Sequence, residues 1–252
     1  MNVIALANLK GGCAKTTTVV NLAACLAELN KRVLVIDLDP QGNSSEWLSE
    51  MPSFPLSALQ LFTDKTPITD LIYPTVCEGV SLIASSPELS SLDKLLAGEL
   101  AVESILKRRL TQIHSQDWDY VLIDTPPMLG LVTLNALTAA NNLIVPVTTH
   151  ILTLAGVAQL LGVIEKIQSV LNPGLKLLGF LPSRVDLRTR HSRDVLETMK
   201  DHFAGQVFNS HIRENIRLAE APSYKKVIIA YDGKCGAAAD FRSFTQEMLR
   251  LI

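Results

Sequence analysis

A group of residues near the start of the chain has the types and spacing of a phosphate-binding loop. Residues 3–7 are apolar and predict a buried strand, and residues 16–30 predict a helix. Glycines between them would let successive backbone N–H groups point at one anion, and the helix N-terminus would add unpaired donors. A lysine there would reach the β- and γ-phosphates of a nucleotide, and a threonine would be a Mg²⁺ ligand. We expect this site to comprise Lys10, Gly11, Gly12, Cys13, Ala14, Lys15, Thr16 and Thr17.

Carboxylates end two further strand-like runs. Asp37 and Asp39 lie at the end of the apolar run 33–37, and Asp124 ends the run 120–124. Ligands of parallel sheets bind at the carboxyl ends of the strands, so these side chains should lie near the loop. Carboxylates there suit Mg²⁺ binding and the positioning of an attacking water. The predicted metal ligands are therefore Thr16, Asp39 and Asp124, the last through a bound water.

Strand-like and helix-like segments alternate along the chain and would position these groups. The apolar runs that predict strands are 3–7, 33–37, 80–84, 120–124, 143–147, 175–181 and, less regularly, 227–230. The helical patterns are 16–30, 86–97, 101–115, 131–141, 153–171, 191–203 and 237–252. Such alternation indicates an α/β fold, a doubly wound and mostly parallel sheet with helices on both faces. We expect one domain over residues 1–252.

Four ordered motifs resemble those of one ATPase family. Residues 10–17, Lys-Gly-Gly-x-x-Lys-Thr-Thr, resemble the deviant Walker A motif of the ParA/MinD family, a P-loop NTPase type. Residues 37–41, Asp-x-Asp-Pro-Gln, resemble switch I of its ParA branch, and residues 124–127 have the family form Asp-x-Pro-Pro. Residues 215–223 match the family's Asn-x-Arg-Leu-x-Glu-Ala-Pro-Ser. The resemblance runs from residue 1 to about residue 245.

Two of these motifs depart from the family pattern, one at Ala14 and one just before the residue 215–223 motif. Ala14 stands where the deviant Walker A motif has a glycine, and its methyl group would matter if the backbone there needs a positive φ. Arg213 and Glu214 replace the usual Pro-Arg before the residue 215–223 motif. In the family, the loop before that helix helps to hold the adenine. The resemblance therefore implies base contacts from Asn209, Ser210, Ile212 and Arg213.

The resemblance also implies how the site would work. The cofactors would be ATP and Mg²⁺, and the catalytic residues would be Lys10, Lys15 and Asp39. Asp39 would position or activate the attacking water, and Lys10 would cross the interface of an ATP-bound homodimer to the partner's phosphates. The dimer would bind non-specific DNA on the nucleoid and position a plasmid, a chromosome origin or a protein body. A ParB-like or adaptor protein would stimulate hydrolysis, and a carboxysome-positioning, McdA-like role is one possibility.

Charge is distributed unevenly along the chain. Residues 184–226 contain nine Lys or Arg and six Asp or Glu, a net charge of +3, whereas residues 1–183 carry a net charge of −5. A basic surface on an acidic protein suits contacts to DNA phosphates, although a solvated surface with ordinary ion pairs is the alternative. The candidate DNA-binding residues are Arg188, Arg190, Arg193, Arg217, Lys225 and Lys226.

Composition excludes several other classes. The four scattered cysteines, with no C-x-x-C spacing, argue against a disulfide framework or a zinc site and favour a cytoplasmic protein. No signal peptide, membrane-length run or amphipathic C-terminal anchor is visible, so no membrane attachment is expected. We expect no helix-turn-helix region ahead of the first strand.

Two alternative functions stay open. One is a metabolic ATPase related to the nitrogenase iron protein, which would need paired cysteines to bridge a cluster. The other is a regulatory nucleotide sensor with little hydrolysis, which Ala14 favours. At single positions, His150 is interpreted as an ordinary loop histidine. Asn135 and Thr148 are predicted to lie at a nucleotide-facing dimer surface.

Overall fold

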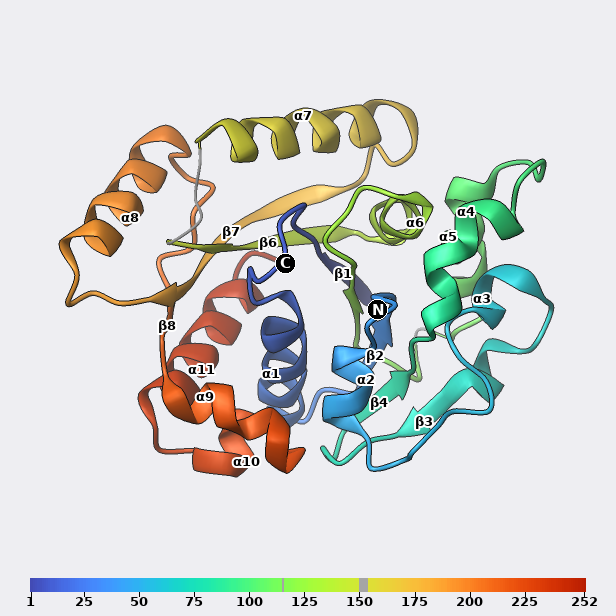
Figure 1. The fold of residues 1–252 in the computed structure, drawn as a ribbon, viewed down its shortest axis with the longest axis horizontal. Coiled ribbons are helices and arrows are strands. Elements are labelled where there is room, and N and C mark those ends of the chain that lie inside the picture. Colours follow the sequence, from blue (N-terminus) through green and yellow to red (C-terminus); the bar gives the residue numbers. More distant parts are fainter. Residues whose placement is uncertain (115, 150–153) are drawn as a thin grey trace.

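The computed structural model describes residues 1–252 except 115 and 150–153. Its centre is an eight-stranded sheet with the order β3-β4-β2-β5-β1-β6-β7-β8 (Figure 1). Neighbouring strands are parallel throughout, except for β3 against β4. The strands are β1 (Asn2–Leu6), β2 (Val33–Asp37), β3 (Ile72–Pro74), β4 (Val80–Ile83), β5 (Tyr120–Asp124), β6 (Asn142–Thr148), β7 (Lys176–Val185) and β8 (Ile212–Arg213).

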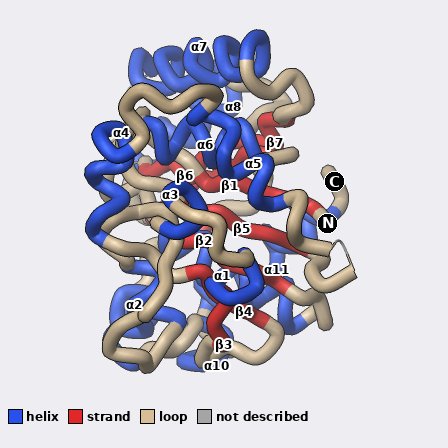
Figure 2. Tube along the Cα trace, turned by 90° about the vertical axis from the view of Figure 1, so that its right-hand side faces the viewer, coloured by secondary structure: helices blue, strands red, loops and turns tan. Residues whose placement is uncertain are grey.

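Helices cover both faces of the sheet, as Figures 1 and 2 show. They are α1 (Lys15–Glu28), α2 (Asn43–Leu48), α3 (Gln60–Thr63), α4 (Leu92–Leu95), α5 (Ile105–Leu110), α6 (Leu131–Ala139), α7 (Leu154–Val170), α8 (Arg190–His202), α9 (Ile216–Glu220), α10 (Ile228–Asp232) and α11 (Gly236–Leu249). Single 3-10 turns are η1 (Ile68–Leu71), η2 (Pro87–Ser91), η3 (Val102–Ser104) and η4 (Ala221–Tyr224).

Two separate hydrophobic cores hold these layers together. Side chains of α1, α2, α10 and α11 pack on one face of the sheet, and those of α3, α5, α6 and α7 pack on the other. The central strands are buried on both faces, which is why their sequences are continuous apolar runs rather than alternating ones. The predicted doubly wound, mostly parallel α/β fold is therefore confirmed.

Most predicted elements are present, and the exceptions have local causes. Residues 227–230 are not a strand: Val227 precedes α10, and the Ile228 amide donates to the buried Asn21 side chain on α1. The patterns at 86–97 and 101–115 each form a 3-10 turn followed by a short helix. The sequence pattern missed α2 and the two short edge strands β3 and β8, because each is too brief to show a period.

Candidate active site

The loop after β1 has the backbone geometry that the sequence motif requires. Gly12 and Ala14 both adopt left-handed backbone conformations, with φ of 72° and 63°. Ala14 is the N-cap of α1, and its carbonyl accepts hydrogen bonds from the amide and the hydroxyl of Thr18, at 2.9 and 2.7 Å. Within the described chain no side chain caps this helix end, and its first turn carries no acidic residue. The α1 N-terminus is therefore free to bind an anion.

Lys15 is buried at the first position of α1. Burial lowers the pKa of its ammonium group, and the carboxylates of Asp124 and Asp39 act in the opposite direction. Because Lys15 lines the cavity beside the loop, this buried cation can stabilise additional negative charge there.

Two fully buried carboxylates lie beneath this loop at the ends of neighbouring strands. Asp37 and Asp124 are paired in the register of β2 and β5. Asp37 Oδ2 accepts hydrogen bonds from the Ser45 amide and hydroxyl, at 2.8 and 2.7 Å. Burial raises the pKa of both groups, that of Asp37 to about 8 with the help of Asp124, and that of Asp124 to about 6. The Asp124 carboxylate disfavours ionisation of Asp37, so the pair resists carrying two negative charges.

The surroundings of Asp124 fit a hard cation. Its Oδ2 accepts hydrogen bonds from the hydroxyls of Thr16 and Ser44, each at 2.7 Å, while Oδ1 is buried and has no hydrogen-bond partner among the described residues. Carboxylate and hydroxyl oxygens are the donors that Mg²⁺ takes in proteins. Sequence reasoning missed Ser44, although a hydroxyl on the helix that follows a switch-like segment was an available signal.

Asp39 is buried at the start of the next turn and lines the cavity beside the loop. Its carboxylate accepts a hydrogen bond from the Gln41 amide at 3.1 Å, and its carbonyl accepts one from the Ser85 hydroxyl at 2.5 Å. These bonds fix the turn 39–42 against the sheet while leaving the carboxylate at the cavity wall.

The cavity has a volume of about 790 Å³ and extends from the loop toward β8, α9 and η4. Besides loop residues it is lined by Asp39, Trp47, Arg184, Ile212, Arg213 and Phe241, among others. Of the residues expected to contact a base, Ile212 and Arg213 thus face the cavity. Asn209 and Ser210 do not line it: their amides donate to the carboxylate of Glu247, each at 2.7 Å.

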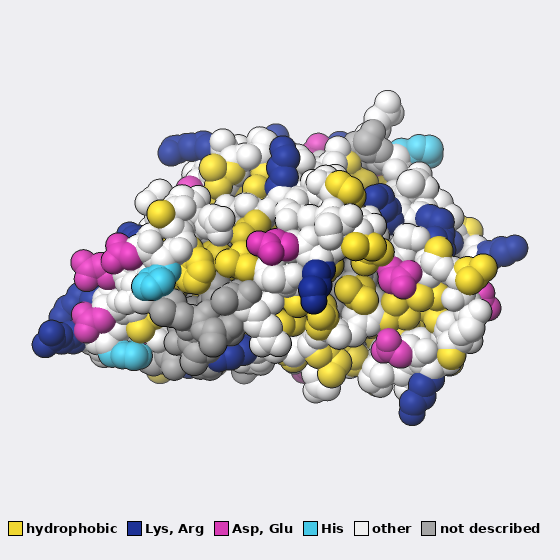
Figure 3. Space-filling view, turned by 90° about the horizontal axis from the view of Figure 1, so that it is seen from above, with side chains coloured by type: hydrophobic (Ala, Val, Ile, Leu, Met, Phe, Trp, Pro, Cys, Tyr) yellow, Lys and Arg dark blue, Asp and Glu magenta, His cyan; other side chains and the backbone are white. Residues whose placement is uncertain are grey.

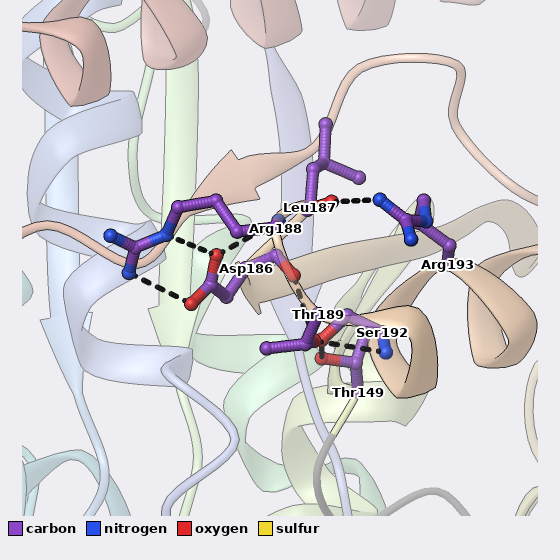
Figure 4. Close-up of polar contacts among 7 residues, drawn as sticks. All are labelled: Thr149, Asp186, Leu187, Arg188, Thr189, Ser192 and Arg193. Carbon is purple, nitrogen blue, oxygen red and sulfur yellow. Dashed lines mark hydrogen bonds and ion pairs between the residues drawn. The ribbon is translucent and has the colours of Figure 1, made fainter.

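The candidate DNA-binding residues form two groups. The first group lies where β7 leads into α8, on the left of Figure 1. Figure 4 shows that Arg188 pairs with both carboxylate oxygens of Asp186 at 2.9 Å, and that Arg193 donates to the Leu187 carbonyl. Arg188 and Arg190 nevertheless leave 91% and 89% of their side chains exposed.

The second group lies around α9 and η4, in a different part of the molecule (Figure 1). Arg217 is close to the carboxylates of Glu220 and Asp232. The Lys225 ammonium donates to the carbonyls of Glu46 and Ser49, at 2.9 and 2.8 Å, and so caps the C-terminus of α2. Lys225 is therefore engaged within the fold, and Lys226 accepts the Trp47 indole N–H on its carbonyl.

No single basic face unites the six residues. On the face drawn in Figure 3, Lys and Arg side chains are dispersed, and those at the α8 end lie beside Asp and Glu side chains. The positive charge of residues 184–226 is thus partly balanced by local ion pairs.

Three minor predictions have different outcomes. Asn135 and Thr148 are predicted at a nucleotide-facing dimer surface, but both are buried and neither side chain lies at a surface. The Asn135 side chain instead joins α6 to η3 and α5. His150 lies outside the described residues.

Lys10 is half-buried, and its backbone amide donates a hydrogen bond to the Asn8 side chain. All four cysteines are free thiols, and among the described residues no helix is long and apolar enough to cross a membrane.

Comparison with known proteins agrees with this geometry. Residues 1–177 match a family model described as an AAA domain. The chain is 40% identical over 249 residues to the chromosome-partitioning ATPase Soj of Thermus thermophilus, which covers 99% of this chain and 96% of that protein. A solved structure of cobyrinic acid a,c-diamide synthase from Mycobacterium smegmatis, with an ATP analogue and magnesium, has a TM-score of 0.87 and 39% identity, covering 99% of this chain and 94% of that one. Apo McdA of Cyanothece has a TM-score of 0.87 and 25% identity, covering 99% of both chains.

Proposed function

Because this chain belongs to the ParA/MinD family, on its Soj/ParA branch of partitioning ATPases, we propose that it forms an ATP-bound homodimer that binds DNA without sequence preference. The chain is an ATPase, and its cofactors are ATP and Mg²⁺. Hydrolysis, stimulated by a partner protein, would release the dimer from DNA and so move a cargo over the nucleoid. The observation that carries the proposal is the uncapped α1 N-terminus above the Asp124 carboxylate, whose second oxygen has no partner in the described chain.

Each residue of the site has a role in this proposal. Lys15 and the amides of the loop hold the phosphates, and Thr16 with Asp124 would hold Mg²⁺, which neutralises charge on the β- and γ-phosphates. Ser44 orients the Asp124 carboxylate through its 2.7 Å hydrogen bond. Asp39, fixed by Gln41 and Ser85, orients the attacking water. Lys10, at the start of the loop, reaches the phosphates of the second subunit.

The exposed arginines at the β7–α8 connection are the proposed DNA contacts. Arg188 lies in the loop before α8, and Arg190 and Arg193 lie in the first turn of that helix. Hydrogen bonds around Thr189 and Ser192 hold this connection (Figure 4). Arg217 is a further candidate on α9, whereas Lys225 is assigned to the support of α2. Three arginines make few phosphate contacts, so one subunit should bind weakly. A dimer makes the second contact intramolecular, which raises avidity.

We infer the class of partner and of cargo from the family. We propose a ParB-like or adaptor protein that stimulates hydrolysis, and a plasmid, a chromosome origin or a protein body as the cargo. The name of the Thermus relative favours a DNA cargo, and the likeness to McdA keeps a protein body as the second choice.

DNA binding in two nucleotide states tests the proposal. A titration of non-specific duplex is run with ATP and with ADP over a series of salt concentrations. We expect binding with ATP only, little dependence on sequence, and a steep loss with salt as counterions are released. Arg188→Glu combined with Arg190→Glu should abolish DNA binding and leave ATP binding unchanged. Lys166→Glu combined with Lys176→Glu, on α7 and at the start of β7, is the charge-matched control. Equal binding in both nucleotide states would refute the proposal, and so would DNA binding that survives the double reversal.

A further inference from the structure

Lys225, directly after η4, has a backbone conformation that lysine rarely adopts. Its φ and ψ are 50° and 39°, in the left-handed region that glycine enters freely and L-residues enter only at a cost. In this conformation its ammonium group donates to the carbonyls of Glu46 and Ser49, at 2.9 and 2.8 Å. Among the described residues, Lys225 is absent from the lining of the ATP cavity and lines a second cavity of about 840 Å³, together with Glu50. A residue outside the nucleotide site thus holds α2 at a cost in backbone strain.

The helix that Lys225 contacts is short and depends on such contacts. α2 has only six residues, and within the described chain no side chain caps its N-terminus. A helix of this length is marginal on its own, because few intrahelical hydrogen bonds offset the cost of ordering it. At its C-terminal end, Lys225 supplies a donor and a positive charge, and the Val76 amide donates to the Leu48 carbonyl at 2.9 Å. The Trp47 indole N–H donates to the Lys226 carbonyl at 2.9 Å, so the segment after η4 helps to fix where α2 lies (Figure 1).

The other end of α2 lies against the two buried carboxylates. The Ser45 amide and hydroxyl donate to Asp37, and the hydroxyl of the fully buried Ser44 donates to Asp124 Oδ2 at 2.7 Å. Thr16 donates to the same oxygen from α1, so two hydroxyls hold Oδ2 while Oδ1 has no partner among the described residues. A displacement of α2 would withdraw Ser44, and the Asp124 carboxylate could then turn about its Cβ–Cγ bond.

We propose that Lys225 is a positioning residue for the magnesium site. Its ammonium group holds α2 at one end, so that Ser44, about one and a half turns away, fixes the Asp124 carboxylate at the other. Outer hydrogen bonds of this kind orient a metal-binding carboxylate, and their loss weakens metal binding about 10–100-fold. The proposal rests on the assignment of Asp124 to Mg²⁺ in the proposed function. It goes further by giving a residue outside the nucleotide cavity control over the metal ligand.

Calorimetry of ADP binding with and without Mg²⁺ isolates the contribution of the metal. The ratio of the two affinities is measured for the wild type and for Lys225→Gly, which fits the left-handed backbone but lacks the ammonium group. Lys225→Arg keeps a cationic donor, and Lys226→Ala is the matched control, because Lys226 contacts Trp47 through its carbonyl. Ser44→Ala and the double variant Ser44→Ala/Lys225→Gly complete a double-mutant cycle. Thermal unfolding of each variant shows that it is folded.

The two single variants should affect the same quantity. Ser44→Ala should reduce the affinity ratio about tenfold, and Lys225→Gly should reduce it by a smaller factor. ADP binding without Mg²⁺ should stay unchanged in both. The double variant should lose no more than Ser44→Ala alone, because Lys225 acts through Ser44. Lys225→Arg should recover most of the loss, and Lys226→Ala should show none.

Trp47 provides a second measurement that needs no ligand. The chain contains two tryptophans, so Trp118→Phe leaves Trp47 as the only one. In that background Lys225→Gly should shift the tryptophan emission of the nucleotide-free protein, because α2 moves relative to the segment after η4. Lys226→Ala should leave the emission unchanged, since the carbonyl that accepts the indole N–H remains.

An unchanged affinity ratio or an unchanged emission in Lys225→Gly would overturn the proposal. So would losses that add in the double variant, or an equal loss of ADP affinity without Mg²⁺. Asp124→Asn separates this proposal from the metal assignment on which it rests, because it should abolish the effect of Mg²⁺ on ADP binding. An effect of Mg²⁺ that survives Asp124→Asn would refute that assignment and the proposal with it.

Discussion

Ala14→Gly should stabilise the protein, although Gly substitutions usually destabilise helical proteins. Ala14 has a φ of 63°, a left-handed conformation that costs an L-residue about 1–2 kcal/mol. Glycine adopts it freely but loses about 0.5–1 kcal/mol more entropy on folding. The net gain is therefore about 0.5–1 kcal/mol. For a chain of this length that corresponds to a rise in Tm of about 1–4 °C.

Chemical and thermal unfolding of the nucleotide-free protein measure this gain. Ala27→Gly is the matched control, because Ala27 lies in the right-handed body of the same helix, where glycine should cost about 1 kcal/mol. Opposite signs for the two substitutions are expected. ATP affinity should change little, because the amide at position 14 remains. A loss of stability in Ala14→Gly comparable with that in Ala27→Gly would refute the argument from backbone strain.

Three further predictions concern the buried groups. Lys15→Ala should abolish ATP binding in calorimetry, because it removes the buried charge beside the phosphates; retained affinity would contradict the assignment. Burial raises the pKa of Asp37 to about 8, so the folded apoprotein binds a proton that the unfolded chain has lost, and its Tm should fall as the pH rises from about 5 to about 8 and level off above that. Asp37→Asn should flatten that slope, and a Tm that rises over this range would exclude the buried proton. Lys225→Gly should speed hydrogen exchange of the amides in α2, because it removes the ammonium that caps the helix, whereas Lys226→Ala should not; equal exchange in both variants would mean that Lys225 does not support α2.

The central site was predictable because each of its parts has a signal in the local sequence. The loop before α1 and the carboxylates at the ends of β2 and β5 follow apolar runs directly, and parallel strands bring their carboxyl ends together. From the sequence, the methyl group of Ala14 matters if φ at that position is positive, and the structure shows a φ of 63°.

Contacts between segments far apart along the chain could not be predicted from the sequence. The Lys225 ammonium caps a helix almost two hundred residues earlier, so its charge alone suggested a DNA contact. The stretch at 227–230 is β-branched and apolar, but the Asn21 side chain and the packing under α1 favour a helix there. Asn209 and Ser210 turn toward Glu247 on α11, a partner that no local pattern indicates.

The oligomeric state of Asp39→Ala with ATP tests the central claim most directly. Replacing Asp39 removes the proposed water-orienting carboxylate and leaves Lys15, Thr16 and Asp124 in place. Light scattering coupled to size-exclusion chromatography, with hydrolysis measured on the same sample, should find a stable dimer that binds ATP as the wild type does and does not hydrolyse it. A monomer that hydrolyses ATP at the wild-type rate would contradict the account.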